Sequence, residues 1–369
     1  MYNKPRIRLR ELLFWRFEMI ETLMVPPFEM DIDEISSADD SPESGWRTVH
    51  VYLPPDYHDE PQRFYPVVYM QDGQNIFSTE QGATVSWDVD LTADRLISAG
   101  FMEPVIIVGI ANTMWRDDEY TPTFDEGEGS GGGADLYLDY LTEKIIPVIE
   151  SHYRIIDQRD SRAICGSSLG GLLALYGAMR HTETFGHIAA ISPSLWWDKK
   201  VIFDIAANWD LEDLETRIWM DMGHHEEDED DEYDYPDEAV DAEYDEDNGV
   251  NDGNGDGDGD DSGDDSGDDE DAEDEDDSNG AISDDDDDSD DDDDLDNDDD
   301  SDDDDDSDND DDDDSDPVQD ARDFCDLLLE RGFVEGEDLI YYEDAWGFHD
   351  EVSWGIRMEK VLLFLFGRE

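Results

Sequence analysis

A serine between glycines offers the clearest chemistry in this sequence of 369 residues. Residues 166–170 read Gly-Ser-Ser-Leu-Gly, which fits the pattern G-x-S-x-G with Ser168 at its centre. An apolar run precedes the motif and a helical pattern follows it, and in that context the motif forms a sharp turn that exposes a nucleophile. The motif therefore predicts that Ser168 attacks acyl groups and that the Leu169 amide faces the oxyanion. The alternative is a small-residue turn that only packs a helix against a strand.

A serine nucleophile needs a base within hydrogen-bond reach, and histidine is the usual choice. His349 follows the last predicted strand, where this type of site places its base. His224 and His225 also follow a strand, but they occupy the position expected for the acid. We therefore predict that His349 is the general base.

The acid is expected between the serine and the histidine in the chain, after the next-to-last strand. Glu226 lies there, and Glu227 and Asp228 are alternatives that spacing alone does not exclude. A second oxyanion amide is expected from the turn that follows the predicted strand 65–70, and we assign it to the backbone of Gln74. The alternative for that turn is a simple Asp-Gly corner.

Apolar runs and helical periodicities alternate along the rest of the chain. The expected strands are 48–53, 65–70, 105–110, 162–165, 187–191, 217–222 and 338–342, with the first two as neighbours. The expected helices are 133–153, 169–180, 202–207, 318–331 and 354–366. Such alternation predicts an α/β fold with a mostly parallel central sheet and helices on both faces. Chemistry in such sheets sits at the carboxyl ends of the strands.

The net charge of −87 is concentrated in one part of the chain. Residues 226–316 contain 57 of the 109 acidic residues and none of the 22 lysines and arginines. A segment so charged and so poor in apolar side chains does not bury enough surface to fold, so we expect it to be disordered. The predicted organisation is an N-terminal extension at 1–35, the main domain in two parts at 36–226 and 317–369, and the acidic insert at 227–316.

This charge excludes some partners and leaves one weak possibility. Nucleic-acid binding needs clustered basic residues, so neither nucleic acid nor an anionic membrane is expected. Within the insert, Asp252, Asn254, Asp256 and Gly257 match the opening of a calcium loop, yet Gly263 stands where a bidentate glutamate belongs. Diffuse, weak binding of divalent cations by the whole insert is the simpler expectation, and no metal or cofactor is expected at the serine site.

The sequence also bears on location. No run approaches the roughly 20 apolar residues of a membrane helix, and Arg and Glu interrupt the apolar stretches of the first 24 residues. The basic residues from Lys4 to Arg16 are expected to form a loosely held tail. Cys165 and Cys325 are the two cysteines, and a disulfide between them is not expected. A cytoplasmic location is the default prediction.

Several blocks of the sequence, in this order and spacing, resemble a known family. They are VYLPPDY, YPVVYMQDGQNIF, IANTMWRDDEYTP, GGGADLYLDYL, ICGSSLGGLLALYGAM, ISPSLWWD and GFHDEVSWGIRMEKVLLFLFG. The chain resembles the putative-esterase branch of the α/β-hydrolase fold, which includes enterochelin-type siderophore esterases, feruloyl and acetyl-xylan esterases and S-formylglutathione hydrolase. The resemblance implies the α/β-hydrolase fold, with Ser168 as nucleophile, His349 as base and Glu226 as acid.

The same resemblance implies roles for other residues. Trp196 and Trp197 are expected near an acyl or aromatic pocket, with ordinary core packing as the alternative. Arg116 is expected either to contact an anionic ligand or, as the simpler choice, to pair with Glu119. The acidic insert departs from the family, and it begins at the loop that carries the acid.

The predicted function is therefore hydrolysis of a small-molecule carboxylic ester through an acyl-enzyme on Ser168. Two alternatives remain. One is an acyltransferase that passes the acyl group to a sugar or an alcohol. The other is a protein that binds cations or basic partners through its acidic insert and whose hydrolase domain is vestigial. The residues indicate neither which ester is used nor the oligomeric state.

Overall fold

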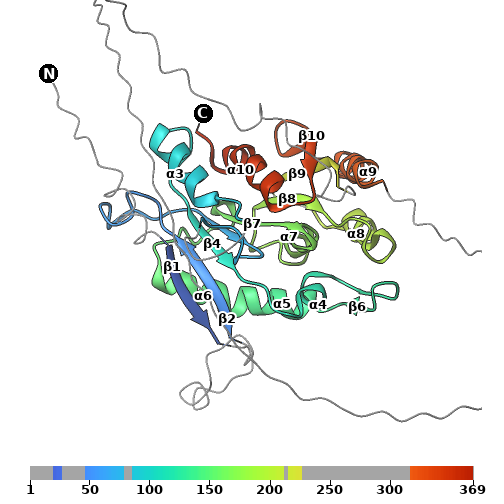
Figure 1. Ribbon diagram of the computed structural model, residues 1–369, viewed down its shortest axis with the longest axis horizontal. Coiled ribbons are helices and arrows are strands. Elements are labelled where there is room, and N and C mark those ends of the chain that lie inside the picture. The colour runs from blue at the N-terminus through green and yellow to red at the C-terminus, as the bar shows by residue number, and fades with distance from the viewer. Residues whose placement is uncertain (1–19, 27–45, 79–84, 212–214, 227–315, 369) are drawn as a thin grey trace, which may run out of the picture. The chain divides into compact units, whose positions relative to one another are not determined.

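The computed structural model describes residues 20–26, 46–78, 85–211, 215–226 and 316–368 (Figure 1). All of them fall in one compact unit, formed by residues 1–233 and 313–369. The predicted insert, apart from Asp316, lies outside the described residues, as do its calcium-loop match and the basic residues between 4 and 16.

In the described part of the chain, eight strands form one sheet. Their order across the sheet is β1-β2-β4-β3-β7-β8-β9-β10. The strands are β1 (Ile20–Val25), β2 (Arg47–Tyr52), β3 (Val67–Met70), β4 (Ile106–Ile110), β7 (Arg162–Ser168), β8 (His187–Pro193), β9 (Arg217–His225) and β10 (Leu339–Phe348). Every pair from β4 to β10 is parallel, whereas β1 with β2 and β2 with β4 are antiparallel. The predicted mostly parallel sheet is confirmed.

One expectation about the sheet is wrong. Strands β2 and β3 are consecutive in the chain, but β4 lies between them and pairs with both. Strand β1 lies inside the segment assigned to an N-terminal extension, where it pairs with β2 along its whole length. Its side chains are partly exposed at the edge of the sheet, so its apolar signal is weak.

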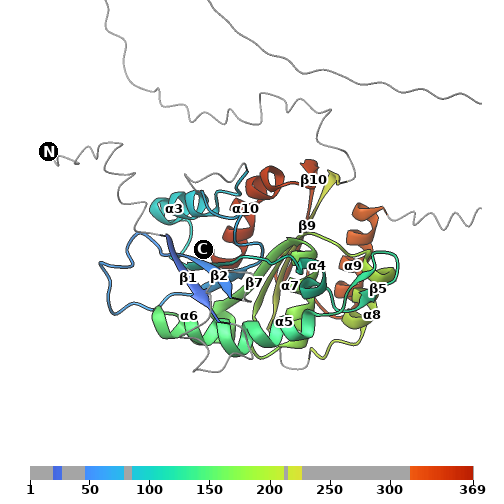
Figure 2. The ribbon, with the colours of Figure 1, turned by 60° about the horizontal axis from the view of Figure 1, so that its bottom comes forward.

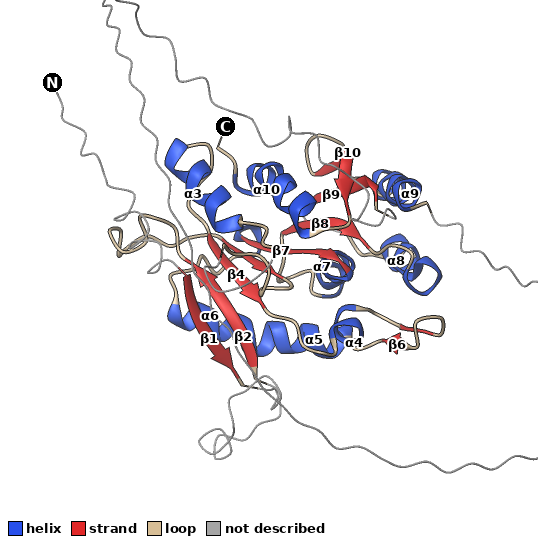
Figure 3. Ribbon diagram, in the orientation of Figure 1, coloured by secondary structure: helices blue, strands red, loops and turns tan. Residues whose placement is uncertain are grey.

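Helices cover both faces of the sheet, as expected (Figures 2 and 3). On one face lie α3 (Val89–Ala99) and α10 (Glu351–Phe366). On the other lie α5 (Ala134–Tyr140), the π-helical turn η2 (Leu141–Ile145), α6 (Ile146–His152), α7 (Leu169–Arg180), α8 (Trp197–Ala207) and α9 (Pro317–Glu330). Short elements complete the fold: α4 (Arg116–Tyr120), the hairpin β5 (Phe124–Asp125) with β6 (Ser130–Gly131), and the turn η3 (Arg159–Ser161).

Alternation along the strands divides the core into two layers. Val67 and Tyr69 pack with the helices of one face, and Val68 and Met70 pack with α3 and α10 on the other. Because successive side chains of a strand point to opposite faces, a strand covered on both sides is apolar throughout. This is why the central strands appear in the sequence as unbroken apolar runs.

Helix α9 begins directly after the acidic segment. The carboxylate of Asp316 accepts hydrogen bonds from the backbone N–H groups of Val318 and Gln319, and Pro317 occupies the first turn. This is a well-formed N-terminal cap. Asp316 therefore belongs to the helix and not to the predicted insert, whose boundary moves by one residue.

An unusual turn opens α8. Asp198, Lys199 and Lys200 have φ of 42°, 56° and 65°, so three consecutive residues are left-handed. The Asp198 amide donates to the Asp125 carboxylate at 2.8 Å, and Lys200 Nζ donates to Asp320 of α9 at 2.5 Å. These contacts hold the turn to β5 and to α9, next to the tryptophan pair.

Replacing Lys199 with glycine is expected to raise the free energy of unfolding by about 1 kcal/mol. A left-handed conformation costs a residue with a side chain roughly 1–2 kcal/mol, and glycine avoids this cost. Part of the benefit is lost because glycine gives the unfolded chain more conformational entropy. Thermal denaturation of the variant should show a higher Tm than the parent protein. Lys144→Gly in the right-handed turn η2 should lower the Tm, and a fall in both variants would contradict the expectation.

Candidate active site

Strand β7 carries Ser168 to the corner at which helix α7 begins. β7 ends at Ser168 and α7 starts at Leu169. The serine has φ 55° and ψ −127°, a conformation that residues with side chains rarely adopt. Strain of this kind is concentrated at functional sites, where the surrounding packing maintains it.

The two glycines of the motif make this corner possible. A Cβ atom on Gly166 would lie 2.4 Å from the Gly170 carbonyl oxygen, closer than atoms can pack. A Cβ atom on Gly170 would lie 3.2 Å from the Cβ of Gln71, in the loop after β3. A side chain at position 166 therefore has no room, and one at position 170 would require the loop to shift by a few tenths of an ångström.

The structure brings His349 and Glu226 together. Glu226 follows β9 and His349 follows β10, two parallel strands whose carboxyl ends lie side by side. His349 Nδ1 donates to Glu226 Oε2 at 2.6 Å. The imidazole also packs edge-on against the ring of Trp354, with 5.1 Å between ring centroids. The histidine side chain is 38% exposed and the glutamate side chain 4%, so the carboxylate is buried beneath an accessible imidazole.

A pocket of about 280 Å³ has Ser168, Glu226 and His349 in its wall. Its other lining residues are Ser192, Pro193, Ser194, Trp196, Met222 and Pro317. The Ser168 Oγ lies 3.3 Å from the Ser194 Oγ, and either hydroxyl can donate. The three residues predicted to act together thus share one cavity, although 181 positions of sequence separate the serine from the histidine.

This arrangement has a defined acid–base chemistry. Because the Nδ1–H group of His349 donates to Glu226, the basic nitrogen of the neutral imidazole is Nε2. A buried carboxylate in this position also stabilises the imidazolium that forms when Nε2 takes a proton. The site is therefore suited to removing a proton from a hydroxyl in the same pocket.

The two predicted oxyanion residues do not line the pocket. Leu169 is the first residue of α7, where backbone N–H groups have no partner within the helix. Gln74 lies in the loop after β3, and its side-chain oxygen accepts a hydrogen bond from the Asn112 amide at 3.1 Å. The roles assigned to these two backbone amides stay predictions.

The two tryptophans have different environments. Trp196 lines the pocket. Trp197 is only 2% exposed, and its Nε1 donates to the Thr123 carbonyl oxygen at 2.9 Å. Their rings pack together with centroids 5.6 Å apart. Trp197 thus supports its neighbour from the core, which is the packing alternative given for this pair.

The expected pair between Arg116 and Glu119 is wrong. Arg116 Nε and Nη2 donate to the Asp72 carboxylate at 2.9 and 3.0 Å. Glu119 accepts instead from the guanidinium of Arg47 in β2, at 2.5 and 3.0 Å. In the short helix α4, Arg116 faces the loop after β3 and Glu119 faces β2. Their spacing of three residues in the sequence does not reveal these separate partners. Contact of Arg116 with an anionic ligand stays a prediction.

Several pocket residues were missed by the sequence reasoning. Ser192, Pro193 and Ser194 come directly after the predicted strand 187–191, at the carboxyl edge where chemistry is expected. Their position at the end of a predicted strand could have identified them as candidate pocket residues. Pro317 lies 149 positions after Ser168, and no local pattern indicates that it borders the same pocket.

An ion cluster joins α9 to the ends of β9 and β10. Arg322 Nε and Nη2 donate to Glu343 at 2.6 and 2.7 Å, and His224 Nε2 lies 3.1 Å from the same carboxylate. The Arg322 guanidinium lowers the pKa of Glu343 from its ordinary value near 4.5 to about 2. The cluster connects α9, the helix that begins at Pro317, to β9 and β10.

Glu343→Gln is expected to destabilise the protein at pH 6 but not near pH 2. Since the folded pKa is depressed, the stabilisation is present above the unfolded pKa of about 4.3 and is lost as the pH falls toward about 2. The pair is exposed to solvent, which screens it, so the difference should be small. Urea denaturation of both proteins across this pH range measures it, and a constant difference would contradict the expectation.

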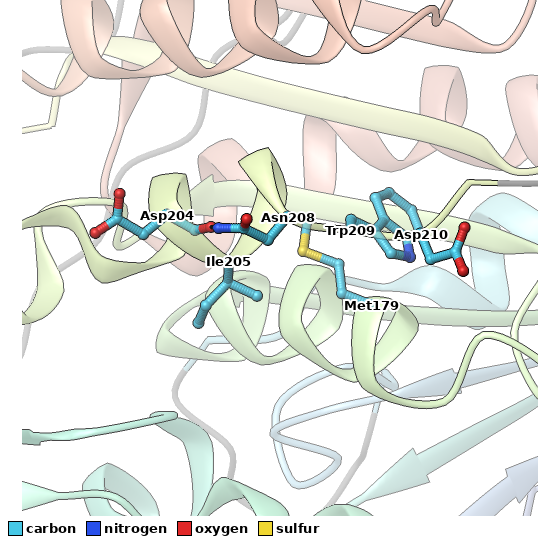
Figure 4. A pocket seen from close by; sticks show the side chains of 6 residues that line it. All are labelled: Met179, Asp204, Ile205, Asn208, Trp209 and Asp210. Atoms are coloured by element: carbon cyan, nitrogen blue, oxygen red, sulfur yellow. Dashed lines mark hydrogen bonds between the residues drawn. The ribbon is translucent and has the colours of Figure 1, made fainter.

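Three further observations concern the described residues only. A second, shallower hollow of about 500 Å³ lies between the ends of α7 and α8, lined by Met179, Asp204, Ile205, Asn208, Trp209 and Asp210 (Figure 4). None of these residues was predicted to act in chemistry.

In the described ranges, no group of three or more His, Cys, Asp or Glu side chains is arranged to hold a metal ion. No described helix is both long and apolar enough to cross a membrane.

Comparison with known sequences gives a family match. Residues 43–256 match the model of the family described as "Putative esterase", a range that includes Ser168 and Glu226 and ends before His349. The uncharacterized protein YbbA of Bacillus subtilis is 30% identical over 189 residues, which cover 50% of this chain and 70% of that protein. The ferri-bacillibactin esterase BesA of the same organism is 29% identical over 172 residues, or 42% of this chain and 57% of BesA. The chain thus spans less than two thirds of that esterase.

Comparison with solved structures agrees on the fold. The BES protein from Bacillus cereus superposes with a TM-score of 0.55 at 16% identity, covering 99% of this chain and 98% of that one. Identity this low supports the fold alone. Because the family model matches more than half of the sequence, the chain belongs to the putative esterase family and has the α/β-hydrolase fold.

Proposed function

We propose that this protein is a serine esterase that hydrolyses small carboxylic esters through an acyl-enzyme on Ser168. The observation that carries the proposal is the shared pocket of Ser168, His349 and Glu226, with a 2.6 Å hydrogen bond fixing the imidazole. The strained corner at Ser168 and the family match support it independently.

Acylation begins with proton transfer. His349 Nε2 takes the hydroxyl proton of Ser168 as its Oγ attacks the ester carbonyl carbon, and the carbonyl π electrons move onto oxygen. Glu226 stabilises the resulting imidazolium. When the tetrahedral intermediate collapses, the bond to the alcohol oxygen breaks, and Nε2 gives its proton to that oxygen. The alcohol leaves, and the acyl group stays on Ser168.

Deacylation repeats these steps with water. His349 Nε2 takes a proton from water as the hydroxide oxygen attacks the acyl carbon, and collapse breaks the bond to Ser168 Oγ. The proton returns to Oγ, and the carboxylic acid leaves. In both halves we assign stabilisation of the oxyanion to the backbone amides of Leu169 and Gln74, the first of which lies at the positive end of α7.

The pocket lining favours an uncharged acyl group. Pro193, Trp196, Met222 and Pro317 give it apolar walls, and among the described residues neither lysine nor arginine lines it. An anionic acyl chain would lose its hydration without gaining a cation there. A volume of about 280 Å³ suits a short aliphatic chain or one aromatic ring. The ferri-bacillibactin esterase BesA is a relative, so ferri-bacillibactin is added to the test panel described next.

The proposal is tested by hydrolysis of a panel of esters beside Ser168→Ala. p-Nitrophenyl acetate and butyrate and a feruloyl ester should be cleaved, whereas p-nitrophenyl palmitate and an ester with a free carboxylate on its acyl chain should react poorly. A fluorophosphonate probe should label the parent protein and not the variant. If no ester is cleaved and no label is incorporated, the proposal is wrong. Transfer of the acyl group to added glycerol, at the expense of hydrolysis, would indicate the acyltransferase instead.

A further inference from the structure

The carboxylate of Glu226 is held by three donors. Oε2 accepts from His349 Nδ1 at 2.6 Å. Oε1 accepts from the Ser192 hydroxyl at 2.6 Å and from the Gly223 amide at 2.5 Å. The side chain is 4% exposed, so protein groups and not water surround the carboxylate.

A buried arginine lies directly behind this carboxylate. The Arg357 side chain is 0% exposed. Its Nη2 donates to the Ser192 Oγ at 3.1 Å, and its Nη1 donates to Asp221 Oδ1 at 2.7 Å. Nη1 is also 4.0 Å from Glu226 Oε1. Arg357 therefore reaches Glu226 through the Ser192 hydroxyl and through the short distance between their charges.

Ser192 has a backbone conformation that fits this connecting role. Its φ is 40°, which is unusual for a residue with a side chain. Its amide donates to Asp221 Oδ1 at 3.2 Å, while its hydroxyl bridges Arg357 and Glu226. One residue in a strained conformation thus contacts Asp221, Glu226 and Arg357, and strain of this kind is concentrated at functional sites.

The charges around Glu226 come from every element packed against it. In the described part of the chain they are Asp221 of β9, Asp344 of β10, Arg357 of α10 and His349 of the loop before it. Asp344 Oδ2 is 3.9 Å from Arg357 Nε, and Trp219 Nε1 donates to Asp221 at 2.7 Å. The buried Cys165 thiol near Asp221 has a raised pKa and stays neutral.

Arg357 is thus the single permanent cation in a cluster with three carboxylates. Burial raises the pKa of Asp221, and the Arg357 guanidinium opposes that rise. If the guanidinium were removed, two buried carboxylates would face each other without a counter-charge. Such a pair takes up a proton. A proton on Glu226 would leave the His349 imidazolium without its partner.

We propose that Arg357 is a positioning residue for this site, and that its buried guanidinium keeps the Glu226 carboxylate ionised and oriented through Ser192. The inference rests on the proposed function and deepens it. Arg357 does not line the pocket and acts on the site through Ser192 and Glu226. It adds a fourth component, on helix α10, to the set of serine, histidine and acid.

The first test compares Arg357→Met with Arg357→Lys in p-nitrophenyl butyrate hydrolysis as a function of pH. Loss of the charge should move the acidic limb of kcat/KM upward by about one pH unit or more, since a cation at 4–6 Å shifts proton binding by that amount. At the plateau, kcat should fall while KM changes little, because the charge acts on the transition state. Lysine keeps the positive charge but does not contact Asp221 and Ser192 at the same time. Arg357→Lys should therefore have the acidic limb at the pH of the parent protein, even if its kcat stays low.

A second test does not depend on whether Arg357→Met folds. Asp221→Asn removes the competing carboxylate, so the acidic limb should move downward, opposite to the shift in Arg357→Met. The double variant Asp221→Asn/Arg357→Met removes one charge of each sign and should return the limb toward that of the parent protein. Arg95→Met is the matched control. Arg95 is an exposed arginine of α3 that pairs with Glu359 of α10, the helix that also carries Arg357. Its replacement should leave the acidic limb unchanged.

A readout without turnover separates this inference from the proposed function. The Nδ1 proton of His349, assigned by comparison with His349→Gln, is hydrogen-bonded to Glu226, so its NMR signal reports protonation of that carboxylate as the pH changes. The midpoint of this change should shift among the variants in the same directions as the kinetic limb. Failure of the parent protein to cleave any ester would remove the proposed function, while this titration would still test Arg357. A midpoint in Asp221→Asn equal to that of the parent protein would overturn the inference, and so would a folded Arg357→Met variant with the midpoint of the parent protein.

Discussion

Ser168→Ala is expected to lower kcat for p-nitrophenyl butyrate by roughly 10⁴-fold or more, because without the hydroxyl no acyl-enzyme forms. The pocket and the proposed oxyanion amides would remain, so a residual rate above that in water is expected. KM should change little, since the alanine fills the same corner of the backbone. Initial rates at saturating ester, with the variant purified free of parent protein, measure the loss.

Ser167→Ala is the matched control for this loss. Ser167 is the neighbouring serine of the motif, is 2% exposed and belongs to the buried strand β7. Its replacement should cost a small part of what Ser168→Ala costs, and the fluorophosphonate label should persist. A variant of Ser168 that kept the activity of the parent protein would remove the proposed nucleophile.

Glu226→Gln is expected to lower kcat by about 10⁴-fold with little change in KM, because it forces the wrong tautomer on the histidine. The Oε1 position receives two donors, the Ser192 hydroxyl and the Gly223 amide, so the glutamine oxygen must occupy it. The glutamine NH₂ group then faces His349 Nδ1. The imidazole must accept there and carry its proton on Nε2, where it does not take the proton of Ser168.

The neighbouring carboxylates provide the controls for Glu226. Glu227→Gln and Asp228→Asn remove the same charge one and two positions later, and each should keep most of the activity. Equal losses in all three variants would indicate a general effect of charge. A large loss only in Glu227→Gln or Asp228→Asn would transfer the role of the acid to that residue.

The alternation of elements could be predicted because it depends on local patterns. The run at 105–110 is apolar throughout and the run at 187–191 is apolar apart from His187, since both faces of those strands are covered. The helix 169–180 was predicted with the bounds observed. The order of strands could not be obtained this way. β4 enters between β2 and β3 through pairing over long sequence distances, which no local pattern records.

The site was predictable to the extent that a motif or chain order indicated it. Ser168 and His349 follow from the glycine pattern and from position after the last strand, and both lie in the pocket. The choice of Glu226 among adjacent carboxylates depends on the Gly223 amide and the Ser192 hydroxyl, which are visible only in three dimensions. Arg357 was missed because a cation on the apolar side of a helix contradicts the pattern that identifies the helix.

The position of the long acidic stretch has a consequence for how the enzyme could be assembled. β9 ends at His225 and α9 begins at Pro317, so no described strand or helix is interrupted between them. Cutting the polypeptide there would yield two pieces, one with the hydroxyl and the carboxylate and the other with the imidazole. The ladder from Leu339 to Asp344 against Ile218 to Gly223, together with the packing of α9 and α10, would be left to hold the pieces together. Activity of the two pieces together is therefore expected to depend on that non-covalent seam.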